Sequence, residues 1–228
     1  MKSVLLYSLP RARSTATLYS CIREIKLNEP FGATALNKNI SHRKNTPWIF
    51  RAELNNNIVI SGQWDNLVKQ MSNSNTVTKI ISSDLQYFLP ARSWFEEVVE
   101  KETHDIFVIE RENREETLFS YIIARHFGWH KLSEVNPYDF TVSNIMLTYI
   151  NNDIDWYLRF YPKKGKIITF ENLPKSHFDK NLNHIENQNS SSKYQYIKNL
   201  DEIKSHIKHI LDYYKDTWDS KIRNLDQS

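Results

Sequence analysis

The chain has 228 residues, and its 30 lysines and arginines against 27 aspartates and glutamates leave a formal net charge of only +3. That length suits one α/β domain with a sizeable core, and that charge is too small to favour nucleic acid as a partner. A single cysteine, Cys21, excludes an intrachain disulfide framework and a cysteine-rich zinc site.

The apolar run near the amino end stops at Pro10 and Arg11. It is therefore too short for a signal peptide or a membrane span. We expect a cytoplasmic protein without stable membrane insertion.

Short runs rich in isoleucine and valine alternate with helical patterns along the chain. The predicted strands are residues 4–8, 77–81, 106–109 and 167–170, and the predicted helices are residues 15–25, 63–71, 93–101 and 115–127. This alternation predicts one α/β domain over residues 1–228, with a mainly parallel sheet flanked by helices. Ligands of such sheets lie beyond the carboxyl ends of the strands.

The last part of the chain contains a polar run and then an amphipathic pattern. Residues 181–196 are predicted to form either a mobile loop or a loop that covers a ligand. Apolar residues recur at helical spacing afterwards, which predicts a C-terminal helix over residues 199–225.

The turn after the first predicted strand has the composition of an anion site. Residues 10–15 read Pro-Arg-Ala-Arg-Ser-Thr and lead into the first predicted helix. The first amides of a helix have no intrahelical acceptor and favour negative charge, while Arg11 and Arg13 add full positive charge. The alternative is an ordinary basic turn with Ser14 as the helix N-cap. The glycine-rich loop of ATP and GTP hydrolases is missing.

A second basic segment follows the third predicted strand. Arg111 leaves the strand end, and Ser120 lies nine positions later on the next predicted helix. The rise of that helix brings Ser120 back alongside the strand end, where the two side chains suit one oxyanion. The alternative is a solvated charge run with Ser120 exposed.

Together the two segments resemble the sulfotransferases that use 3′-phosphoadenosine-5′-phosphosulfate (PAPS). The family's first loop commonly reads Pro-Lys/Arg-Ser-Gly-Ser/Thr-Thr, which residues 10–15 match in part. Its second motif places a serine eight or nine residues after an arginine, and the spacing here looks more like the bacterial trehalose-sulfotransferase branch. Residues 165–173 are similar to the family's late strand ending in Tyr-Glu-Asp-Leu.

The resemblance implies a P-loop-like architecture and a nucleotide donor held at both ends. Arg11, Ser14 and Thr15 would hold the 5′-phosphosulfate, and Arg111 with Ser120 would hold the 3′-phosphate. In place of a late glycine-rich segment found in the family, the polar run up to Lys193 is expected to cover the nucleotide. The implied cofactor-binding residues are thus Arg11, Ala12, Arg13, Ser14, Thr15, Arg111, Ser120 and Lys193.

The chain departs from the family at three places. Arg13 stands where glycine is usual, so the loop either avoids a positive φ there or accepts strain, and the added cation is expected to contact sulfate. The Lys-x-His motif of many members keeps only its lysine, Lys79, because Ile81 replaces the histidine. The late glycine-rich cofactor segment is not recognisable.

The missing histidine leaves the general base to another residue. In the trehalose branch a glutamate soon after the first helix has this role, and Glu29 matches its place better than Glu24, which continues the helical pattern. His42 and His104 are alternatives, since histidine is the commonest general base. The expected catalytic residues are Arg11, Glu29 and His42.

The activity implied is transfer of a sulfuryl group from PAPS to an acceptor hydroxyl on a sugar, a lipid or a small molecule. Cations and oriented amides suffice to stabilise the leaving phosphate, so no metal is expected. Two other functions stay open: a P-loop-like kinase that binds nucleotide or phosphate, and a non-catalytic protein that uses a PAPS-binding fold for recognition.

Overall fold

The computed structural model describes residues 1–31, 61–87, 89–126, 143–182 and 198–226. Five parallel strands form one sheet in the order β2-β3-β1-β4-β5. The strands are β1 (Ser3–Ser8), β2 (Ile25–Asn28), β3 (Thr76–Ile81), β4 (His104–Ile109) and β5 (Lys166–Ile168). The predicted α/β class with a parallel sheet flanked by helices is confirmed.

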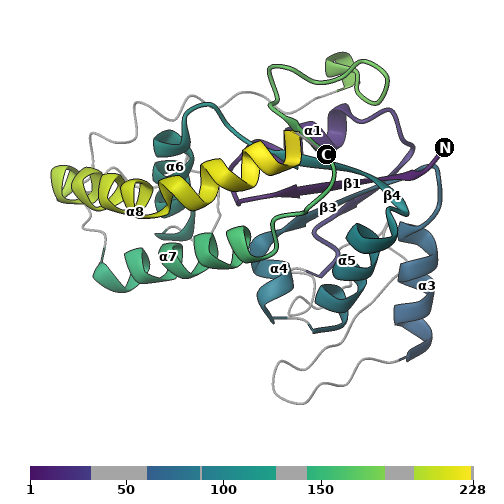
Figure 1. The fold of residues 1–228 in the computed structure, drawn as a ribbon, viewed down its shortest axis with the longest axis horizontal. Helices are drawn as coiled ribbons and strands as arrows, with labels where there is room; N and C mark the ends of the chain where they lie inside the picture. Colours follow the sequence, from purple (N-terminus) through teal and green to yellow (C-terminus); the bar gives the residue numbers. More distant parts are fainter. Residues whose placement is uncertain (32–60, 88, 127–142, 183–197, 227–228) are drawn as a thin grey trace.

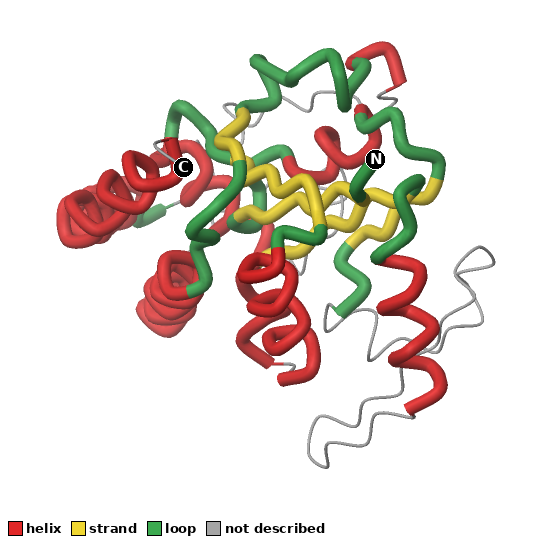
Figure 2. The backbone as a smooth tube through the Cα atoms, turned by 45° about the vertical axis from the view of Figure 1, so that its right-hand side comes forward, coloured by secondary structure: helices red, strands yellow, loops and turns green. Residues whose placement is uncertain are grey.

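Helices cover both faces of this sheet, with most of them on one side (Figures 1 and 2). The described helices are α1 (Ser14–Ser20), α3 (Ser61–Met71), α4 (Ser82–Tyr87), α5 (Leu89–Lys101), α6 (Arg114–His126), α7 (Asn144–Arg159) and α8 (Leu200–Asp226), with a 3₁₀ turn, η3, at Lys180–Leu182. In Figure 1, α3, α4, α5 and α7 lie below the strands, and α1 lies above them.

The central strand β1 is apolar on both faces because both faces are covered. Leu5 and Tyr7 belong to the larger core, which the helices below the sheet close. Val4 and Leu6 belong to a smaller core, which Leu18 of α1 closes from the other side. Continuous apolar runs such as this one are typical of parallel strands buried on both sides.

The register of the sheet brings the carboxyl ends of several strands to the same edge. Ser8, the last residue of β1, pairs with Ile81 at the end of β3 and with Ile109 at the end of β4. On the outermost strand, Asn28 ends β2 opposite Lys79. The segments that follow these four strands therefore start close together, as ligand-binding loops do in open α/β sheets.

The predicted helix over residues 15–25 is wrong beyond Ser20. The structure ends α1 there, and Ile25 begins β2, which pairs with β3 from Thr76 onward. Ile22 and Ile25 have helical spacing, but β3 offers Ile25 a ladder of parallel hydrogen bonds. Tertiary pairing outweighs the local pattern.

Two helices, α4 and α7, lie where no helix was predicted, whereas α8 at Leu200–Asp226 starts and ends within one residue of its predicted bounds. Of the polar run 181–196, only residues 181 and 182 are among those described. In the described part of the chain, no helix combines the length and the hydropathy needed to cross a bilayer.

Candidate functional site

The turn between β1 and α1 has a left-handed backbone at both of its arginines. Arg11 has φ 68° and Arg13 has φ 59°. Arg13, which stands at the usual glycine position, therefore adopts the conformation that glycine would favour. It is also the N-cap of α1 and makes no side-chain capping bond, so the alternative with Ser14 as N-cap is wrong. Ser14 is instead the first helical residue and is buried.

Arg11 reaches from this turn to the second predicted motif. Its Nε donates a hydrogen bond of 3.1 Å to Oγ of Ser120, on α6, across 109 positions of sequence. Ser120 is almost fully buried, whereas Arg11 is exposed. The structure thus joins the two segments that sequence analysis singled out independently.

Arg111 lies just beyond β4 and pairs with a carboxylate of its own segment. Its Nη2 is 2.6 Å from Oε1 of Glu116, in the first turn of α6. Charge-assisted contacts of this length are among the stronger polar interactions in proteins. The guanidinium therefore already holds an oxyanion.

A buried lysine connects α1 with β2. Lys79, on β3, is 1% exposed, and its Nζ donates to Oγ1 of Thr15 at 2.7 Å. The same Nζ is 2.5 Å from Oε1 of Glu29. Glu29 follows β2 with φ 49°, and its amide donates to the carbonyl of Lys79 at 3.0 Å. One ammonium group therefore positions Thr15 and Glu29 together.

A second carboxylate lies at the same edge of the sheet. Asp84, in α4, is buried, and its Oδ2 accepts the amide of Ile81 at 3.1 Å. Burial, followed by the nearby charge of Glu29, raises the pKa of Asp84 well above its usual value. Lys79 opposes this shift in the pKa of Asp84. The edge therefore combines one buried ammonium with two carboxyl groups.

The segment after β5 contacts the first turn through Arg13. Nη1 of Arg13 is 2.6 Å from Oε1 of Glu171, and the guanidinium lies over the ring of Phe170 at 5.8 Å. Lys180 donates to the carbonyl of Glu171 at 2.6 Å. Residues 165–173, the third segment of the family resemblance, thus reach the first turn. Arg13 pairs with protein carboxylate here, so its expected contact with sulfate would require Glu171 to move.

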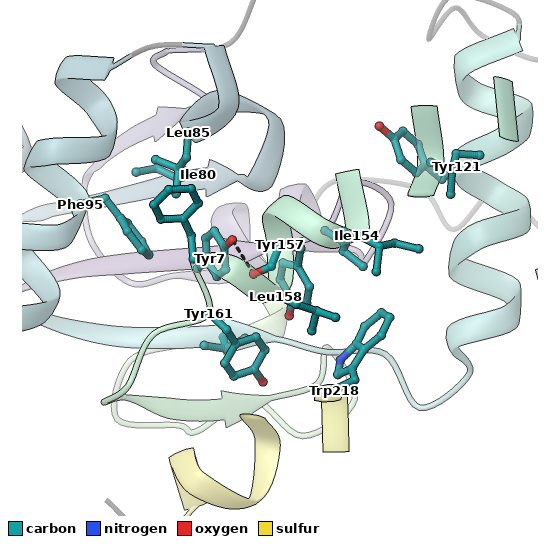
Figure 3. Close-up of a cluster of buried hydrophobic side chains, with 14 of the residues drawn as sticks. Tyr7, Ile80, Leu85, Phe95, Tyr121, Ile154, Tyr157, Leu158, Tyr161 and Trp218 are labelled. Carbon is teal, nitrogen blue, oxygen red and sulfur yellow. Dashed lines mark hydrogen bonds between the residues drawn. The ribbon is translucent and has the colours of Figure 1, made fainter. Parts of the chain in front are cut away.

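Glu110 is a buried carboxylate next to Arg111. Its Oε1 accepts hydrogen bonds from Tyr157 at 2.7 Å, from Trp218 at 2.9 Å and from Tyr161 at 3.2 Å. Tyr157 also accepts, through its carbonyl, the hydroxyl of Tyr7 at 3.0 Å (Figure 3). These bonds attach β1, β4, α7 and α8 to one another just behind the site.

The pKa of Glu110 is raised because desolvation outweighs its hydrogen bonds. The folded protein therefore binds this proton more tightly than the unfolded chain does. The corresponding stability is complete at low pH and is lost as pH rises from the unfolded pKa toward the folded one.

We expect Glu110→Gln to lose part of this pH dependence, because an amide oxygen still accepts hydrogen bonds but carries no charge. Thermal unfolding between pH 4 and pH 8 measures the effect. The wild-type melting temperature should fall relative to that of the variant as pH rises. Glu112→Gln, an exposed neighbour, is the control, and identical profiles for wild type and Glu110→Gln would contradict the argument.

The alternative bases lie elsewhere or outside the described residues. His104 begins β4, at the opposite edge of the sheet, where its ring contacts the carbonyl of Met71 at 3.1 Å. Its pKa is lowered, mainly by burial. Glu24 precedes β2 and accepts a hydrogen bond from Asn75 at 2.7 Å. His42 and Lys193 fall outside the described residues.

Sequence analysis missed two charged groups at this edge and one behind it. Lys79 was noted only as the remnant of a motif, and Asp84 and Glu110 were not singled out. Two of the three have a signal in the sequence: Lys79 interrupts an apolar strand, and Glu110 directly follows one, whereas Asp84 has none. Charges are rarely buried without a partner, so such interruptions point to a buried pair.

A groove of about 660 Å³ opens next to Arg111, between the start of α6 and α8. Its lining includes Arg111, Thr169, Leu211 and Ile222. Both apolar and charged side chains are therefore available to a ligand that reaches Arg111. Within the described ranges, no group of three or more histidine, cysteine, aspartate or glutamate side chains is arranged to hold a metal ion.

The edge therefore combines guanidinium groups and hydroxyls, which suit an anion, with the partly exposed carboxylate of Glu29, which can accept a proton. The buried ammonium of Lys79 positions Thr15 and Glu29. Comparison of the chain with protein-family models, with curated proteins and with solved structures gave no match.

Proposed function

We propose that the protein is a sulfotransferase that moves a sulfuryl group from PAPS to an acceptor hydroxyl. Arg11, Ser14 and Thr15 bind the 5′-phosphosulfate, and Arg111 with Ser120 binds the 3′-phosphate. Glu29 is the general base for the acceptor.

The observation that carries this proposal is the hydrogen bond from Arg11 to Ser120. A nucleotide that carries a 5′-phosphosulfate and a 3′-phosphate needs two anion sites, and these sites can lie no farther apart than the two groups do. The resemblance assigns Arg11 to one end of the nucleotide and Ser120 to the other. Their direct contact brings the two segments together, as two anion sites for one nucleotide require, and an open groove lies beside Arg111.

The reaction needs little beyond orientation and charge. The acceptor oxygen forms a bond to sulfur while the bond from sulfur to the bridging phosphate oxygen breaks, and 3′,5′-adenosine diphosphate leaves with that electron pair. Arg11 stabilises the charge that grows on the leaving oxygen. Glu29 takes the acceptor's proton, and Lys79 holds Glu29 at 2.5 Å and Thr15 at 2.7 Å, which fixes the base relative to the first turn of α1.

Nucleotide selectivity tests the proposal. We expect calorimetry to show 3′,5′-adenosine diphosphate binding at least about tenfold more tightly than AMP, a difference of about 1.4 kcal/mol. The 3′-phosphate is the only group that distinguishes the two ligands. Arg111→Ala should remove most of this preference while the melting temperature stays near that of wild type.

Equal affinities of the wild-type protein for the two nucleotides would overturn the proposal. Turnover separates the enzyme from a non-catalytic binding protein, because both prefer the 3′-phosphate but only the enzyme labels an acceptor from PAPS. Acceptors are found by screening sugars, phenols and lipid head groups with labelled PAPS. A kinase would instead require the γ-phosphate of a nucleoside triphosphate.

A further inference from the structure

Three cations of the candidate site are each paired with a carboxylate of the protein. Lys79 pairs with Glu29, Arg13 with Glu171, and Arg111 with Glu116, at 2.5, 2.6 and 2.6 Å. Only Glu29 has a role in the proposed reaction. The other two carboxylates therefore need a separate explanation.

In all three pairs the carboxylate is more exposed than its cation. The contrast is clear at Arg111, whose side chain is 14% exposed while that of Glu116 is 35% exposed. Solvent therefore reaches the Glu116 side chain more readily than the guanidinium. A phosphate that binds Arg111 in the same way has to replace Glu116.

We propose that Glu116 is a built-in competitor for the phosphate site of Arg111, and that it sets the affinity of that site for a phosphomonoester dianion. This inference rests on the proposed function, which assigns Arg111 to the 3′-phosphate. In the structure the Glu116 carboxylate takes the place beside the Arg111 guanidinium that a phosphate oxygen of the ligand would take. Binding of the nucleotide is an exchange of one oxyanion for another.

The exchange is energetically feasible because Glu116 is partly solvated already. The released carboxylate gains hydration, and the incoming phosphate keeps the mostly buried Arg111 paired, so no buried charge is left without a partner. A dianion gains more from Arg111 than a single carboxylate does. The carboxylate weakens ligand binding without blocking it.

Removal of the competing charge should therefore strengthen binding. We expect Glu116→Gln to bind 3′,5′-adenosine diphosphate about fivefold or more tightly than wild type, measured by calorimetry at low salt. AMP, which lacks the 3′-phosphate, should change less than twofold. Glu96→Gln, which removes the same charge from an exposed position on α5 outside the groove lining, should change either affinity less than twofold.

A double variant tests whether the effect acts through Arg111. In the Arg111→Ala background, Glu116→Gln should no longer strengthen binding of 3′,5′-adenosine diphosphate. Unchanged or weaker binding by Glu116→Gln alone overturns this inference, as does an equal gain for AMP or for Glu96→Gln. The proposed function survives those results if wild type still prefers the 3′-phosphate. If wild type lacks that preference, the proposed function itself fails.

Discussion

Arg11→Ala is expected to lower kcat for sulfuryl transfer by about 10²-fold or more, the loss typical of removing one donor to a developing oxyanion. The bridging oxygen gains most of its charge in the transition state, so kcat should fall further than the affinity for 3′,5′-adenosine diphosphate. Steady-state kinetics with PAPS, together with calorimetry, measure the two effects.

The fold should tolerate this change because Arg11 is exposed and sits in a turn. Arg223→Ala, which removes an exposed arginine from α8, is the matched control and should keep wild-type kinetics. If kcat is unchanged and only KM rises, Arg11 contributes to the binding of PAPS but not to the chemical step, and the catalytic cation is another residue. Lys79 would then be the first alternative to test.

Glu29→Gln is expected to lower turnover by about 10²-fold or more, with nucleotide affinity within a few-fold of wild type. The amide oxygen still accepts a hydrogen bond from Lys79, so the geometry at Thr15 is kept. What disappears is the capacity to take a proton from the acceptor. Transfer of label from PAPS to an acceptor found by screening provides the measurement.

Glu24→Gln is a close control because Glu24 lies at the other end of β2, where it accepts a hydrogen bond from Asn75. Its turnover should equal that of wild type. Full activity in Glu29→Gln, combined with loss of activity in His42→Ala, would assign the base to His42 and end the analogy with the trehalose branch.

The sheet was largely predictable because most of its strands contain short runs of buried apolar residues. Four of the five strands lie where runs of isoleucine, leucine and valine predict them. The fifth, β2, was missed, since Ile25 and Leu27 look helical until β3 is known to lie alongside. Its existence depends on pairing between residues about 50 positions apart, which no local pattern reports.

The site was predictable in part for a related reason. Charged and hydroxyl residues at strand ends mark the edge of a parallel sheet, which is how Arg11 and Arg111 were found. Their carboxylate partners were not found, because Glu116 and Glu171 look like ordinary surface charges in the sequence. Asp84 lies in a short helix without a clear pattern, and only the fold brings it to Glu29.

The left-handed backbone at Arg11 and Arg13 affects how this protein would respond to selection for thermal stability. Each of these residues carries a conformational cost of about 1 kcal/mol or more, and glycine would remove it. A library screened only for heat resistance should accumulate glycine at these two positions, but not at Glu29, because glycine there would leave the buried Lys79 without its carboxylate partner. The same library should lose the two cations on which the proposed chemistry depends, so activity and heat resistance oppose each other in this turn.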